Sequence, residues 1–375
     1  MYKQEIHISD MTTFKSCRRL WYFSSLLQRG LEPNVPYAPF FSGRAIHYCL
    51  ERYYGELTPP LVEAMQGYLQ TFLDKEMKDV AGMDLWAMEE TMFEEQVELI
   101  SGMLDHYVLW VNSNHNQLWS DDNLEFISLE TEFSVPLLTP RGNRSNRVFL
   151  AGRFDGLVRR RDNGTYWIWE TKTAASPKRL QATLDNNEQS GAYVYAAQQL
   201  IGENISGVLY NILRKKVPAA PRVLKSGALS QAQDQDTTPA LYLQAIKDNH
   251  PGLADDPQWI MDNYGPFLQT LMDRQSEKPF FLRIPIRRTS QEVQGLSQRI
   301  WQVALEMTRS STALYTNASW GTCGNCRFKG PCLAWEAGAD VDSILSREYR
   351  PRRRWDPLVG QDLEEPEHEY TNGSH

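Results

Sequence analysis

The hydrophobic positions of the chain follow two different periods, and the change between them divides the sequence. From Ser9 to Gly30 apolar residues recur at helical spacing, and these two residues suit the first and last positions of a helix. Cys17 lies on the apolar face of this segment. A second helix is predicted at about 42–56 and a helical insertion at 61–118. The N-terminal third is therefore predicted to be helical.

Strand-like segments follow this helical third. Runs rich in aromatic and β-branched residues, bounded by turn residues, predict strands. The three that matter most are "NLEFISLETEFSVPLL" (123–138), "RVFLAGRFDGLVRRR" (147–161) and "TYWIWETKT" (165–173). Helical patterns resume at 187–201 and 290–310, and further strands are expected at 205–216 and 279–289. Strands that alternate with helices indicate an α/β fold.

The last two of the three strands form a hairpin in this interpretation, with a two-residue turn at Asn163-Gly164. Counting back from that turn sets Asp155 opposite Lys172, with Glu170 on the adjacent diagonal. Directly opposed side chains share a face of the sheet and diagonal neighbours are within reach. Three charged groups are therefore predicted to converge, provided that the strand register holds.

Two carboxylates and an ammonium group on one sheet face suit phosphoryl chemistry. Carboxylate oxygens are hard ligands for Mg²⁺ or Mn²⁺, and a lysine beside the metal can orient the attacking water. Gly152 and Gly156 flank Asp155 and permit close approach of a ligand. The alternative is an ion pair on the surface of a hairpin, which is common for a Glu-X-Lys sequence.

Composition restricts the class of protein. The 375 residues are 41% apolar and 23% charged, which is typical of a globular chain rather than a disordered one. There is no apolar run of about eighteen residues and no signal-peptide pattern, so a cytoplasmic protein without a membrane span is expected. The net charge of −8 argues mildly against a nucleic-acid partner. Basic runs at 159–161, 214–216 and 350–354 can still form a basic groove.

The cysteines suggest a metal site. Cys323, Cys326 and Cys332 have the spacing C-x₂-C-x₅-C in a glycine-rich loop, and Cys17 is the candidate for a fourth ligand. Disulfides are improbable in a reducing cytosol. The spacing leaves a zinc site and an iron–sulfur cluster both open. Cys49 falls outside the pattern and is predicted to be a buried free thiol.

Four segments together resemble the PD-(D/E)XK nuclease superfamily: "GRAIHYCLE", "GRFDG", "ETK" and "QSGAY". The resemblance is to its RecB-like branch, which includes CRISPR-associated RecB-like exonucleases, the AddB nuclease domain and phage exonucleases. It covers about 148–201 well, and the N-terminal helices and the C-terminal cysteines more weakly.

The resemblance implies a set of roles for site residues. Asp155 and Glu170 match the metal-binding acids, together with the backbone carbonyl of Thr171, and His47 matches an additional metal ligand. Lys172 matches the base that positions water. For His47, the alternative is a core histidine of an amphipathic helix.

Two further groups of residues take their roles from the same resemblance. Gln189 and Tyr193 share a helix face at i and i+4 and are expected to help hold DNA, although a tyrosine alone is most often a packing residue. The four-cysteine arrangement implies a [4Fe–4S] cluster, with zinc as the alternative. Its ligands are Cys17, Cys323, Cys326 and Cys332.

The fold implied is a restriction-endonuclease-like core, with a central mixed sheet flanked by helices and with helical N- and C-terminal elaborations joined by the four-cysteine cluster. The expected division of the chain is 1–60 for N-terminal helices with Cys17 and His47, 61–122 for a helical insertion, 123–290 for the core with an inserted loop and helices at about 218–278, 291–355 for the C-terminal helix and cysteines, and 356–375 for a flexible acidic tail.

The function implied is a Mg²⁺- or Mn²⁺-dependent deoxyribonuclease, most simply an exonuclease on single-stranded DNA or duplex ends in recombination, repair or phage DNA metabolism. The chain has no G-x-x-x-x-G-K-[ST] sequence of its own, so a separate helicase or recombination partner is a further expectation. The alternatives are a non-catalytic DNA-binding or assembly factor on the same fold, and an endonuclease.

Overall fold

The chain forms two compact units. The computed structural model describes residues 3–34, 38–55, 62–80, 90–113, 117–309 and 311–352. The first unit comprises Met1–Met11 and Pro36–Arg309, and the second comprises Thr12–Val35 and Ser310–His375. The predicted acidic tail, 356–375, lies outside the described residues.

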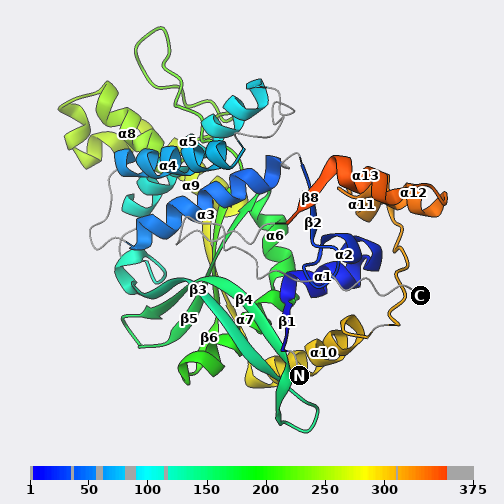
Figure 1. The fold of residues 1–375 in the computed structure, drawn as a ribbon. Helices are drawn as coiled ribbons and strands as arrows, with labels where there is room; N and C mark the ends of the chain where they lie inside the picture. Colours follow the sequence, from blue (N-terminus) through cyan, green and yellow to red (C-terminus); the bar gives the residue numbers. More distant parts are fainter. Residues whose placement is uncertain are drawn as a thin grey trace. The chain divides into compact units, whose positions relative to one another are not determined.

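A six-stranded mixed sheet forms the centre of the first unit (Figure 1). Its strands are β1 (Gln4–His7), β3 (Leu124–Leu138), β4 (Arg144–Arg160), β5 (Tyr166–Ala174), β6 (Ile205–Arg214) and β7 (Phe281–Arg287). The order is β1-β4-β5-β6-β7, and β3 runs antiparallel along β4. Strands β5 and β6 are parallel, whereas β7 is antiparallel to β6. The sheet confirms the predicted α/β class with a mixed sheet.

Helices flank the sheet. They are α3 (Ala38–Gly55), α4 (Val62–Val80), α5 (Glu90–Ser113), α6 (Pro177–Leu184), α7 (Glu188–Ile201), α8 (Pro239–Asn249), α9 (Pro257–Glu277) and α10 (Ser290–Met307), with short 3₁₀ turns η1 (Asp121–Asn123) and η2 (Leu253–Asp255). Helix α3 packs on β3 and β5. Helix α7 packs on β3, β5 and β6, and α10 packs against α7. No helix in the described part of the chain is long and apolar enough to cross a membrane.

The hairpin between β4 and β5 differs from the prediction in its turn. Four residues, 161–164, form the loop, because the Arg160 N–H donates to the Thr165 carbonyl and Gly164 takes a positive φ of 70°. The register therefore pairs Gly156 with Trp169, and one step further brings Asp155 beside Glu170 instead of Lys172. The error is two residues, and since side chains alternate with a period of two, it leaves the predicted convergence of charges intact.

The helix predicted at Ser9–Gly30 is broken in two. Helix α1 (Ile8–Ser16) and helix α2 (Arg18–Ser24) are separated by Cys17, whose backbone is extended at φ −160° and ψ 114°. An extended residue cannot continue an α-helix, so the Cys17 side chain leaves the apolar stripe that the sequence suggested.

The second unit joins segments from both ends of the chain. Its other elements are β2 (Leu31–Pro33), α11 (Trp320–Cys323), α12 (Lys329–Glu336), α13 (Val341–Glu348) and β8 (Tyr349–Pro351). Strands β2 and β8 pair antiparallel. A small core of Phe23, Phe328 and Leu345 holds α2, α12 and α13 together, with the Phe23 and Phe328 rings stacked at 5.4 Å.

A buried arginine ties the helices of the first unit to the sheet. The Arg283 side chain on β7 is 6% exposed and lies 2.6 Å from Asp121. It donates to the hydroxyls of Tyr54 on α3 and Tyr107 on α5, at 3.0 and 3.3 Å. Its guanidinium also lies over the Trp169 ring on β5. One cation therefore connects α3, α5, η1, β5 and β7.

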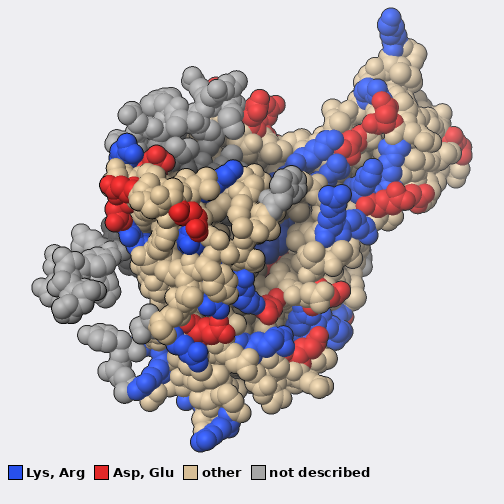
Figure 2. Space-filling view, turned by 90° about the vertical axis from the view of Figure 1, so that its right-hand side faces the viewer, with Lys and Arg blue, Asp and Glu red and all other residues tan. Residues whose placement is uncertain are grey.

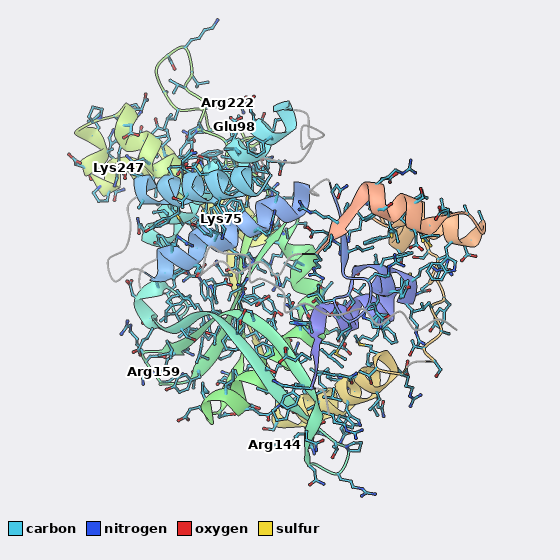
Figure 3. The ribbon with its side chains drawn as sticks, in the orientation of Figure 1. Lys75, Glu98, Arg144, Arg159, Arg222 and Lys247 are labelled. Atoms are coloured by element: carbon cyan, nitrogen blue, oxygen red, sulfur yellow. The ribbon has the colours of Figure 1, made fainter. Side chains whose placement is uncertain are left out.

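We expect Arg283→Met to destabilise the first unit strongly. Removing one partner of a buried ion pair costs about 3–5 kcal/mol, and here two buried tyrosine hydroxyls also lose a donor. Urea unfolding measures the effect. The matched control is Arg159→Met, because Arg159 is an exposed residue near the end of β4 (Figure 3), paired with Glu125 at 3.0 Å. Exposed pairs of this kind contribute little to stability, so equal losses in the two variants would contradict this account.

Candidate active site

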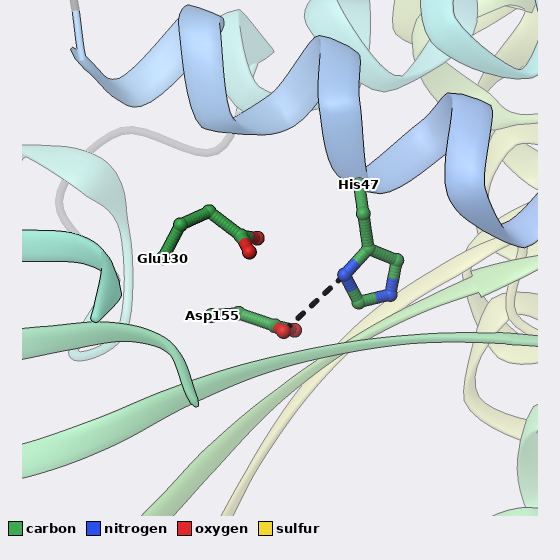
Figure 4. A group of neighbouring side chains, drawn as sticks. All are labelled: His47, Glu130 and Asp155. Atoms are coloured by element: carbon green, nitrogen blue, oxygen red, sulfur yellow. Dashed lines mark ion pairs between the residues drawn. The ribbon is translucent and has the colours of Figure 1, made fainter. Parts of the chain in front are cut away.

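Helix α3 presents His47 to Asp155 on β4. His47 Nδ1 lies 3.3 Å from one Asp155 oxygen, and the other oxygen accepts the Thr171 N–H at 2.6 Å. The imidazole points from the helix toward the sheet (Figure 4). The predicted neighbourhood of His47, Asp155 and Thr171 is therefore present. The backbone carbonyl of Thr171 stays a predicted metal ligand.

Glu130 on β3 is a third member of this group. The register pairs Leu129 with Gly156 and Thr131 with Phe154, so Glu130 and Asp155 occupy the same step between them. Glu130 has a positive φ of 42°, the only such non-glycine residue described, and strained backbone of this kind concentrates at functional sites. Arg153 Nε holds its carboxylate at 2.7 Å.

Sequence reasoning missed Glu130. Glu130 and Glu132 are two residues apart on one strand, where alternation places both side chains on the same face, yet Glu130 is 5% exposed and Glu132 is exposed. The difference comes from the irregular backbone of β3, which alternation alone does not reveal. The available signal was the position of Glu130 in the strand that pairs with the one carrying Asp155.

A hydrogen-bonded chain runs from Glu170 into helix α7. The Lys172 ammonium donates to Glu170 and, at 3.3 Å, to the amide oxygen of Gln189. The Gln189 amide nitrogen then donates to the Tyr193 hydroxyl at 2.8 Å. The predicted i, i+4 face of Gln189 and Tyr193 is confirmed. The pair holds Lys172 in place, and its role in holding DNA stays a prediction.

Burial and charge together set the pKa values at the site. Burial, followed by the charge of Asp155, raises the pKa of Glu130 and of Glu170 to about 7. Burial opposes ionisation of Asp155, but the neighbouring charges of His47 and Lys172 outweigh it and lower the pKa. Burial lowers the pKa of His47 and the Asp155 carboxylate more than compensates, so the net shift is upward.

These groups suit a divalent cation. His47, Glu130 and Asp155 each offer a ligand atom, and the three atoms lie within 4.8 Å of one another. One oxygen of Glu170 is buried without a hydrogen-bond partner, which is costly unless a cation or water satisfies it. Imidazole and carboxylate donors together fit Mn²⁺ or Mg²⁺. Glu170 lies beside this group of three instead of inside it.

The other predicted metal ligands lie in the second unit. Cys17 occupies the break between α1 and α2, Cys323 ends α11, and Cys332 lies on α12. Burial raises the pKa of the Cys326 thiol, and the nearby thiols of the other three cysteines raise it further. All four thiols are free and only partly exposed. All four cysteines belong to the second unit, and their binding of one metal centre stays a prediction.

Cys49 is the fifth cysteine, and it lies in the first unit. It is completely buried, and burial raises the pKa of its thiol to about 12. The prediction of a buried free thiol is confirmed.

Comparison with known proteins supplies an independent result. The chain matches a family model described as "PD-(D/E)XK nuclease superfamily" over residues 7–333. A search of curated proteins found no match. The matched region contains His47, Glu130 and Asp155.

Without divalent cations, we expect the stability of the first unit to fall as pH rises from about 5 to 8. Glu130 and Glu170 have folded pKa values of about 7, above the ordinary 4.5. Protons held only by the folded state stabilise it at low pH, and this contribution is lost as pH rises through 7. Mn²⁺ should therefore raise Tm more at pH 8 than at pH 5.5, which thermal unfolding measures.

Glu170→Gln is the control for this titration. The variant should show a flatter dependence of Tm on pH in the metal-free protein, since one titrating group is gone. A Tm gain from Mn²⁺ that is the same at pH 5.5 and pH 8 in the wild type would contradict the assigned pKa shifts.

Proposed function

Because the chain belongs to the PD-(D/E)XK nuclease superfamily, we propose that it hydrolyses phosphodiester bonds of DNA. We further propose that it is an exonuclease of the RecB-like branch, acting on single strands or duplex ends with Mg²⁺ or Mn²⁺. DNA recombination, repair or phage DNA metabolism would be its setting, and a helicase or recombination partner stays a prediction.

One observation carries this proposal: a group of residues able to bind a cation and a half-buried lysine meet at one place. His47, Glu130 and Asp155 form the group, and Lys172 lies beside it, held by Glu170 and Gln189. An ordinary hairpin ion pair would be exposed. Here Glu170 is 3% exposed, and buried ionisable groups with shifted pKa values are found at functional sites more often than exposed ones.

Each residue has a distinct part in the proposed hydrolysis. His47, Asp155 and the carboxylates of Glu130 and Glu170 would hold the cation. When bound, Mg²⁺ or Mn²⁺ supplies charge stabilisation for the phosphoryl group and lowers the pKa of a water.

Lys172 would hold and orient the attacking water by hydrogen bonding. Glu170 and Gln189 fix its ammonium, so that the position of the Lys172 Nζ is set before substrate arrives. The Thr171 N–H fixes Asp155 in the same way. The site is therefore preorganised by bonds within β4, β5 and α7.

Ion pairs within the protein weaken two of the basic runs, 159–161 and 214–216, as DNA-binding surfaces. Lys and Arg side chains are interspersed with Asp and Glu on the face shown in Figure 2. Arg159 pairs with Glu125, and Arg214 and Lys216 both pair with Asp236. These pairs neutralise much of the charge expected to attract the DNA backbone.

We also propose a [4Fe–4S] cluster at the four cysteines of the second unit. The spacing of the cysteines leaves zinc and iron both open. The resemblance of their arrangement, one cysteine near the N-terminus and three near the C-terminus, to the iron–sulfur members of the RecB-like branch favours iron.

Lys172→Ala should abolish cleavage of DNA and leave DNA binding within about twofold of wild type. The variant loses the group that orients water and keeps the cation ligands. End-labelled single- and double-stranded DNA, digested with Mg²⁺ and with Mn²⁺, measures cleavage, and a gel shift in Ca²⁺ measures binding. A wild type that binds DNA but cuts nothing in Mn²⁺ supports the alternative of a non-catalytic DNA-binding factor.

A covalently closed circle is the control for the exonuclease assignment. An enzyme that requires an end leaves circular single-stranded DNA intact while it degrades the linear form. Linearisation of a closed circle would instead establish an endonuclease on the same fold.

Anaerobically purified protein should be brown and contain about four iron and four sulfide per chain. Cys326→Ser should remove most of both, because Cys326 packs in the core of the second unit and its thiolate is a predicted ligand. Iron and acid-labile sulfide assays measure the content. A colourless, active protein with one zinc per chain would refute the cluster. Cys49→Ser, which alters a cysteine outside the site, should leave iron unchanged.

A further inference from the structure

An arginine is buried beside one of the four cysteines. Arg19 lies on α2, two residues after Cys17, and its side chain is 9% exposed. Its Nη1 approaches the Cys332 sulfur at 3.8 Å, within the range of a hydrogen bond to sulfur. The two residues come from opposite ends of the chain but from the same unit.

Other contacts fix the guanidinium of Arg19 in this position. Its Nε donates to the Leu314 carbonyl at 3.4 Å, and Nη1 also pairs with the Glu336 carboxylate. The guanidinium plane lies over the Trp335 ring at 5.0 Å. Cys332 and Glu336 are i and i+4 on α12, so both face the same cation. Arg19 is therefore held against the sulfur from several sides.

We propose that Arg19 is a positioning residue for the Cys332 thiolate and that it raises the reduction potential of the iron–sulfur cluster. This inference rests on the proposed cluster. Hydrogen bonds to ligand sulfur and nearby charge are known controls of cluster potential. One-electron reduction adds a negative charge without a proton, and a cation beside the sulfur stabilises that charge more when both are shielded from water.

The competing interpretation is an ion pair between Arg19 and Glu336 that only braces α2 against α12. The two interpretations predict different signs for the change in reduction potential. If the pair is merely structural, removing either partner has the same effect on the potential. If Arg19 acts on the sulfur, removing Arg19 lowers the potential. The Glu336 side chain is 58% exposed. Removing its negative charge leaves the positive charge of Arg19 beside the sulfur without a counter-ion, and this raises the potential.

The experiment compares four variants of the full chain: Arg19→Met, Arg19→Lys, Glu336→Gln and Arg29→Met. Arg29 is the matched control, since it is an arginine of the same unit paired with Asp342 at 2.6 Å and its side chain is 37% exposed. Dithionite titration with redox mediators, followed by visible absorption and electron paramagnetic resonance, gives each midpoint. Iron and sulfide content are measured on every sample.

Arg19→Met should lower the equilibrium constant for reduction by about tenfold, which is about 59 mV for a one-electron couple. Arg19→Lys, which keeps the charge, should recover part of this shift. Glu336→Gln should shift the midpoint in the opposite direction, and Arg29→Met should leave it unchanged.

Two results would overturn the inference, and they are distinguishable from failure of the wider proposal. Equal midpoints in the wild type and in cluster-containing Arg19→Met refute the tuning role, and if Arg19→Met holds no cluster, an unchanged midpoint in Glu336→Gln refutes it instead. Shifts of the same sign in Glu336→Gln and the Arg19 variants assign Arg19 to structure alone. If the wild type contains no iron or sulfide, the cluster proposal itself fails, whereas the DNA digest reports on the nuclease assignment separately.

Discussion

Negative charge held away from water is the constraint on which the first unit depends. Asp155, Glu130 and Glu170 lie on three neighbouring strands, and two of them are almost fully buried. Desolvated carboxylates that repel one another are costly, and their charge must be offset by cations and donors. The surrounding structure supplies these from separate elements: His47 from α3, Arg153 from β4 and Lys172 from β5. Helix α3 contributes to this balance of charge through His47, and it also packs on β3 and β5.

The fold and most of the site could be predicted because their signals are local. The strands around Asp155 and Glu170 were recognisable from their residues, and a shift of two in the hairpin register left every side chain on its predicted side. A two-residue error is harmless in a sheet, whereas an error of one would have separated Asp155 from Glu170. His47 needed the family resemblance, since a histidine on an amphipathic helix looks the same whether it binds metal or packs.

What escaped prediction depends on geometry that no short window of sequence contains. Glu130 reaches the site because β3 is irregular and because β3 pairs with β4, and neither fact is visible around residue 130. The break at Cys17 is similar, since the helical pattern continues across it and only tertiary contacts favour the extended residue. Strands β2 and β8 are three residues each and pair across the whole chain, which leaves almost no local signal.

The second unit has a consequence for the order in which the protein matures. It is built from Thr12–Val35 and from Ser310–His375, with most of the first unit, Pro36–Arg309, between them. Synthesis proceeds from the N-terminus at roughly 5–20 residues per second, so helix α2 waits about 15 to 60 seconds for its partners to be synthesised. During that interval Phe23 lacks its stacking partner Phe328, and Cys17 lacks the three other thiols. The segment Thr12–Val35 is thus made well before its partners and is among the last parts of the two units to reach its final surroundings.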